Sequence, residues 1–161
     1  MPKISWLVSA VSGRGAIVAD TGAILALLDR GDLHHDSLRT LFDENPNAWI
    51  LPWAILPEVD YLATKELGHA AATAFVDDVA DGSFRVEWGH EADVARAREI
   101  SHQYADLAVG LVDAVVMAIA ERLSAGAIAT LDLRHFGAVT LEGAPKLVPR
   151  DLPRKARRRS K

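Results

Sequence analysis

The chain has 161 residues, of which 50% are apolar and 25% charged, an ordinary composition for a single globular domain. It has no cysteine, which excludes a disulfide scaffold, a thiolate metal site and a cysteine nucleophile. No apolar run approaches the roughly 20 residues of a membrane-spanning helix. We therefore expect no membrane association and a cytoplasmic location.

The net charge of −4 conceals an uneven distribution of charge. Six of the 18 basic residues lie in Arg154–Lys161, which leaves 12 basic against 22 acidic residues in the rest of the chain. A basic tail is typical of segments that bind nucleic acid, and it is also typical of solubilising chain ends. We predict an N-terminal extension at 1–15, one domain at 16–149 and a basic tail at 150–161.

Helical patterns and short apolar strand patterns alternate along the domain, which predicts an α/β fold with a mainly parallel sheet flanked by helices. The expected elements, in chain order, are a strand at 17–19, helices at 23–29 and 35–43, a strand at 49–51, helices at 57–67 and 70–80, an edge strand at 84–88, a helix at 91–104, a buried helix within 107–120, a strand at 127–130, a helical turn at 133–136, and short strands at 139–141 and 146–148. In the helix at 91–104, we expect Val94 and Ile100 to face inward.

Two aspartates each follow an apolar strand of the predicted sheet. Asp20 ends the first strand and stands where the N-cap of the next helix belongs. Asp132 follows the strand at 127–130 in the same way. Ligands bind at the carboxyl ends of strands in open α/β sheets, so the two carboxylates are candidates for one site. A helix cap for Asp20 and a turn residue for Asp132 are the alternatives.

Asp113 is the only charged residue in the apolar run 107–120. A helix that is apolar on nearly every side is buried, and a carboxylate there is costly unless it is paired, hydrogen-bonded or bound to metal. Because Gly110 precedes it, we expect Asp113 in the first helical turn, where the helix dipole favours an anion. A salt bridge to Arg122 or Arg134 is the alternative to a functional role.

Further candidates are less distinctive. Glu58 follows Pro57 at a helix start, where glutamates usually just complement the dipole. Asp106 lies seven residues before Asp113, about two helical turns away if the helix extends that far. Arg134 is a candidate for contact with phosphates, although such residues are more often solvated.

Several carboxylates that lie close together without a lysine or arginine beside them need a cation to neutralise their charge. All-oxygen ligation suits hard ions such as Mg²⁺ or Mn²⁺. The six histidines offer no zinc spacing, and no His-Glu-x-x-His pattern occurs. A bound ion can activate water for attack on a phosphodiester, and it also allows an acidic domain to accept a polyanion.

Two other protein classes share parts of this pattern. Asp20-Thr21-Gly22 spells the aspartic protease triplet, but the triplet occurs once and opens a helix in an α/β pattern. A receiver-like phosphoacceptor domain also places acids at strand ends and is the best α/β alternative on spacing alone. No P-loop, G-x-G-x-x-G or G-x-S-x-G motif is present.

Four segments, in this order and at this spacing, resemble a PIN domain and most closely the VapC toxins of type II toxin–antitoxin systems. The segments are 17–20, 57–59, 110–114 and 129–136. The resemblance covers about residues 16–149, while the N-terminal extension and the arginine-rich tail depart from the family pattern. It implies a PIN-like, Rossmann-like domain and a Mg²⁺-dependent endoribonuclease in which Mn²⁺ can replace Mg²⁺.

The resemblance also implies the roles of individual residues. The implied catalytic and metal-binding acids are Asp20, Glu58, Asp113 and Asp132. Thr130 matches a hydroxyl residue that often stands two positions before the fourth acid, and Asp106 fits a common upstream aspartate. The implied partners are an RNA substrate, a second copy of the chain, and an antitoxin whose C-terminal segment crosses the active-site groove, forming a toxin–antitoxin hetero-oligomer.

A function of another class remains as the alternative. A non-catalytic acidic α/β module would bind a basic partner peptide or nucleic acid, and the same acids would then act through their charge alone.

Overall fold

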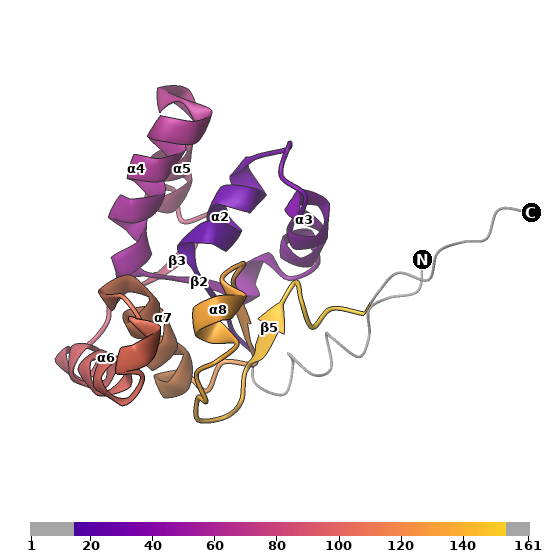
Figure 1. The fold of residues 1–161 in the computed structure, drawn as a ribbon. Coiled ribbons are helices and arrows are strands. Elements are labelled where there is room, and N and C mark those ends of the chain that lie inside the picture. The colour runs from indigo at the N-terminus through magenta and orange to yellow at the C-terminus, as the bar shows by residue number, and fades with distance from the viewer. Residues whose placement is uncertain (1–14, 154–161) are drawn as a thin grey trace, which may run out of the picture.

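The computed structural model describes residues 15–153, so most of the predicted N-terminal extension and basic tail lies outside the described residues (Figure 1). The helices are α2 (Thr21–Leu28), α3 (His35–Glu44), α4 (Leu56–Leu67), α5 (His69–Ala80), α6 (Glu91–Gln103), α7 (Leu111–Arg122) and α8 (Leu133–Phe136), with short 3₁₀ helices η1 (Pro46–Ala48), η2 (Trp53–Ile55) and η3 (Ala105–Leu107). The strands are β1 (Ile17–Ala19), β2 (Trp49–Pro52), β3 (Arg85–Glu87), β4 (Ala127–Ala129) and β5 (Lys146–Val148).

The five strands form one parallel sheet in the order β3-β2-β1-β4-β5. This confirms the predicted α/β fold and places β3 at an edge. In the central strand, Ile17 is opposite Trp49 of β2 and Ala127 of β4. The chain runs from β1 outward to β3 and then returns to place β4 on the other side of β1. Strand order therefore reverses between β1 and β4, which is where open α/β sheets bind ligands.

The helices cover the sheet in packed pairs. Figure 1 shows α4 beside α5 and α6 beside α7, and α7 also packs against β1 and β2. Every residue from Ala114 to Ala120 in α7 is buried. The apolar strands β1 and β4 are also fully buried, as expected for a parallel sheet with helices on both faces. Within the described range, 15–153, no helix is both long and apolar enough to span a bilayer.

The apolar run 107–120 is not one helix. Leu107 ends η3, Ala108 adopts a left-handed φ of 51°, and α7 begins only at Leu111. The break places Asp113 in the first turn of α7, as predicted. It also separates Asp106 from α7, so the two-turn relation between Asp106 and Asp113 does not form.

Two local predictions are wrong. Val94 does not face inward, since 47% of it is exposed, and Asp93 occupies the buried position one residue earlier. The segment 139–141 is not a strand but part of the loop between α8 and β5, where Val139 and Leu141 pack into the core. The two errors have different causes: a charged residue takes the inward position in α6, whereas Val139 and Leu141 alternate as in a strand but lie in a loop that pairs with no strand of the sheet.

Asp93 is buried because an arginine pairs with it. Arg122 donates from Nε to Asp93 Oδ1 at 2.7 Å and from Nη2 to Asp93 Oδ2 at 2.9 Å, and Nη2 also bonds Glu87 at 3.0 Å. Although burial raises the pKa of Asp93, the Arg122 guanidinium holds that pKa below its usual range. This network ties β3, α6 and α7 together. It also means that Arg122 does not pair with Asp113.

Candidate active site

Asp20 lies at the carboxyl end of the central strand and starts the next helix. Its backbone N–H donates to the Ala129 carbonyl of the neighbouring strand at 2.8 Å. Its side chain caps α2, because Oδ1 accepts a hydrogen bond from the Thr21 N–H at 2.8 Å. The predicted N-cap is therefore confirmed. The residue is only 5% exposed, so its carboxylate is held in a site with little access to water.

Thr130 connects the ends of the two central strands. Its hydroxyl donates to Asp20 Oδ2 at 2.9 Å and accepts from the Asp132 N–H at 3.0 Å. Thr130 is itself buried. One hydroxyl thus fixes the Asp20 carboxylate on β1 and the turn after β4 that carries Asp132.

Asp132 and Asp113 meet at a histidine. Asp132 caps α8 by accepting from the His135 N–H at 3.1 Å, and its Oδ2 lies 3.0 Å from His135 Nδ1. Asp113 Oδ2 lies 2.7 Å from the same nitrogen. One ligand atom from each of the three residues falls within 4.8 Å of the others, a spacing that can hold a metal ion. The partner of Asp113 is therefore His135, and neither of the predicted arginines pairs with it.

The pKa values link Asp20 and Glu58 to this group. The pKa of Asp20 is raised to about 7, chiefly by burial, with a further contribution from the negative charge of Asp113 and a smaller one from Glu58. The hydrogen bonds from Thr130 and Thr21 oppose this shift. Burial also raises the pKa of Asp113, to which the charge of Asp132 contributes. Asp20 is thus repelled by the charges of Asp113 and Glu58, and Asp113 by that of Asp132, and a divalent cation would relieve this repulsion.

Comparison with known proteins agrees with this geometry. The model of the PIN domain family matches residues 17–140, which is most of the chain. The chain belongs to the PIN-domain family. Among curated proteins, this PIN domain is 29% identical over 123 residues to ribonuclease VapC26 of Mycobacterium tuberculosis, a match that covers 76% of this chain and 91% of VapC26.

Solved structures have the same fold. VapC20 of Mycobacterium tuberculosis, described as a toxin that cleaves the sarcin-ricin loop, is similar with a TM-score of 0.69 and 23% identity over 81% of this chain and all of VapC20. DNA-bound VapBC from Salmonella typhimurium is similar with a TM-score of 0.63 and 19% identity, covering 82% of this chain and 96% of the matched chain. These similarities confirm the PIN-like fold that the sequence predicts.

His135 is the residue of this PIN domain that sequence reasoning missed. The histidines have no zinc-type spacing, whereas the relevant relation is between the N-cap aspartate of α8, Asp132, and a histidine three residues later in that helix. Residues at i and i+3 lie on one face of a helix. The spacing of Asp132 and His135 was therefore a usable signal, but the contact with Asp113 depends on the tertiary fold.

The two remaining candidates lie at the margin of the site. Asp106 is exposed in η3, next to Leu107, whose carbonyl lies 3.1 Å from His135 Nε2. Arg134 is exposed on α8, one position before His135. Neither contacts the four carboxylates in any interaction found within residues 15–153.

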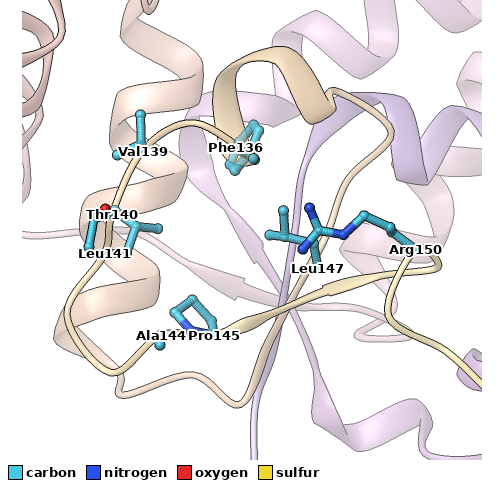
Figure 2. Close-up of a pocket in the computed structure, with 9 residues that line it drawn as sticks. Phe136, Val139, Thr140, Leu141, Ala144, Pro145, Leu147 and Arg150 are labelled. Atoms are coloured by element: carbon cyan, nitrogen blue, oxygen red, sulfur yellow. The ribbon is translucent and has the colours of Figure 1, made fainter.

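A hollow lies between the end of α8, the loop that follows it and β5 (Figure 2). It has a volume of about 190 Å³ and is lined by Phe136, Gly137, Val139, Thr140, Leu141, Ala144, Pro145, Leu147 and Arg150. No carboxylate lines it, so it lacks the oxygen ligands that a divalent cation requires. The acidic group of Asp113, Asp132 and His135, unlike this pocket, offers carboxylates at a spacing that could hold a metal ion.

The raised pKa of Asp20 predicts how stability changes with pH. The pKa of Asp20 in the folded state, about 7, exceeds the ordinary aspartate value of 3.8, so the folded state binds the proton more tightly than the unfolded state does. The stabilisation from this proton is complete below about pH 4 and is lost as the pH rises through about 7, a change on the order of 4 kcal/mol. Asparagine does not titrate in this range, so the stability of the Asp20→Asn variant lacks this contribution to the pH dependence.

Urea unfolding in EDTA, at pH 4 to 8, measures this difference. We expect the stability of Asp20→Asn relative to the wild type to increase between pH 4 and 7 and then to level off. A difference that does not depend on pH would contradict the assignment of a raised pKa to Asp20.

Proposed function

We propose that this PIN domain is a metal-dependent endoribonuclease that acts as the toxin of a type II toxin–antitoxin system. Its similarity to ribonuclease VapC26 and its fold similarity to the VapC20 toxin support this function. The observation that carries the proposal is that Asp113 and Asp132 share His135, while the Thr130 hydroxyl joins the Asp20 carboxylate to the turn that carries Asp132, beside the point where strand order reverses. Asp20 and Asp132 come from strand ends, and Glu58 and Asp113 come from the first turns of α4 and α7.

We assign these four acids as the ligands of Mg²⁺, which Mn²⁺ can replace. Carboxylate oxygens are the ligands that both hard ions prefer. Two of the acids have raised pKa values because they are buried near other acids, and such a group of charges is stable when a cation neutralises it. The residues therefore fit a divalent cation.

The chain's own residues orient the reacting groups. The Thr130 hydroxyl and the Thr21 N–H hold the two oxygens of Asp20 in fixed directions. The cap on α8 holds Asp132, since Oδ1 is engaged by a backbone N–H and Oδ2 faces the site. When bound, the cation supplies the Lewis acidity that activates water and neutralises charge on the phosphate. We propose that Arg134, which is exposed and precedes His135, contacts a flanking phosphate of the RNA.

Cleavage of RNA and thermal unfolding, each with and without metal, test the proposal. We expect cleavage in millimolar Mg²⁺ or Mn²⁺ and none in EDTA. We also expect the ion to stabilise the fold by about 2.7 kcal/mol at a concentration 100 times its Kd, through binding linkage. Potassium chloride at matched ionic strength is the control. A non-catalytic acidic module would show neither effect, and that result would overturn the proposal.

The proposal extends to partners and location. The fold similarity to the DNA-bound VapBC of Salmonella typhimurium supports a cognate antitoxin for the present chain. We propose that the antitoxin covers the acidic cluster, that the domain forms a homodimer within a toxin–antitoxin hetero-oligomer, and that it acts on RNA in the cytoplasm. A neighbouring gene for a small DNA-binding protein, and copurification of its product with this chain, are the expected findings.

A further inference from the structure

The ring of His135 is held in one orientation by contacts on both nitrogens. Nε2 lies 3.1 Å from the Leu107 carbonyl oxygen, and Nδ1 lies 2.7 Å from Asp113 and 3.0 Å from Asp132. A carbonyl oxygen only accepts hydrogen bonds, so Nε2 carries a proton and donates it to Leu107. The side chain is 16% exposed, and the ring therefore has little freedom to turn away.

This arrangement is the one that metal-binding histidines use. Such a histidine commonly donates its other ring N–H to a backbone carbonyl, which fixes both the tautomer and the ring orientation. In the PIN domain, the Leu107 carbonyl accepts that bond and Nδ1 is the nitrogen that faces the carboxylates.

The spacing of the three atoms also fits a shared ion. Two neighbouring ligand atoms of an octahedral ion with bonds of about 2.1 Å lie about 3.0 Å apart. His135 Nδ1 lies at 2.7 Å and 3.0 Å from the oxygens of Asp113 and Asp132. Nδ1 and each of these oxygens are therefore spaced like adjacent ligands of one cation.

We propose that His135 Nδ1 binds the divalent cation together with Asp113 and Asp132, and that this nitrogen makes the site prefer Mn²⁺ over Mg²⁺. The cation takes the place of the proton that Nδ1 shares with the carboxylates, and that proton leaves to solvent. Imidazole suits first-row transition metals, whereas Mg²⁺ prefers oxygen ligands and retains water. The inference rests on the proposed function, because it adds a ligand to the same metal site.

Electron spin-echo envelope modulation of the protein with one equivalent of Mn²⁺ tests this directly, because a coordinated imidazole gives a ¹⁴N modulation. We expect this modulation in the wild type, its loss in His135→Gln and its retention in His102→Gln, where the replaced histidine is exposed. In calorimetric titrations, His135→Gln is expected to lower Mn²⁺ affinity about ten- to a hundred-fold and Mg²⁺ affinity much less.

The outcomes separate this inference from the proposed function. If Mn²⁺ binds to the wild type but its spectrum lacks ¹⁴N modulation, His135 is not a ligand, while the carboxylate site stands. If the wild type binds neither ion, both the inference and the proposed metal site are wrong. The wild-type spectrum decides the first point even if His135→Gln does not fold.

Discussion

The Asp113→Asn variant is expected to cleave RNA at least about a hundred-fold more slowly than the wild type, and so is Asp20→Asn. Replacing residues that merely orient metal ligands commonly costs ten- to a hundred-fold in metal affinity or activity, so the loss of a ligand should cost at least as much. Each change removes one negative charge from the four carboxylates while leaving the side-chain volume almost unchanged. Cleavage of RNA in Mg²⁺ measures the effect, and growth arrest on expression provides a second readout.

These variants should keep the fold. Asparagine caps helices about as well as aspartate, so Asp20→Asn retains the N-cap of α2. The matched control is Asp78→Asn, which changes an exposed acid on α5 and should cleave like the wild type. Full toxicity in Asp20→Asn or Asp113→Asn would contradict the assignment of these residues.

The Arg122→Ala variant is expected to lose about 3–5 kcal/mol of unfolding free energy. It leaves Asp93, whose side chain is 3% exposed, buried without its positive partner, and breaking a buried ion pair on one side has this cost. Urea unfolding at pH 7 measures the change. Arg39→Ala is the control, because the Arg39–Asp43 pair is about half exposed and should contribute at most about 1 kcal/mol.

The double variant Asp93→Leu/Arg122→Met shows whether Arg122→Ala loses stability because Asp93 is left buried without a partner or because the packing of the arginine side chain is lost. Replacing both partners with apolar residues removes the uncompensated carboxylate, and we expect it to be less destabilising than Arg122→Ala alone. If Arg122→Ala unfolds at the same urea concentration as Arg39→Ala, the network does not have the structural role we assign to it.

The parts of the fold that could be predicted are those in which local pattern and tertiary environment agree. Strands β1 and β4 are short apolar runs because both sheet faces are covered, and an aspartate after each run marks the point where the strand ends. The lone charge of Asp113 within an apolar run similarly identified a carboxylate that needs a partner. Each of these signals is contained in a local stretch of sequence, the longest being the apolar run 107–120.

The parts that could not be predicted depend on contacts between distant segments. Asp93 is buried only because Arg122, 29 residues later, neutralises it, and a hydrophobic period assigns that inward position to Val94 instead. The role of His135 depends on Asp113, 22 residues earlier, and on the Leu107 carbonyl, 28 residues earlier. Such pairings follow from the strand order, which periodicity alone does not determine.

The central claim is that acids far apart in the chain share one divalent ion, and a calorimetric Mn²⁺ titration tests it most directly. We predict that the wild type binds the ion and that Asp20→Asn and Asp113→Asn each bind it at least about ten-fold more weakly, as expected when either of two ligands is removed. If both variants bind Mn²⁺ as tightly as the wild type, Asp20 and Asp113 do not hold a common ion.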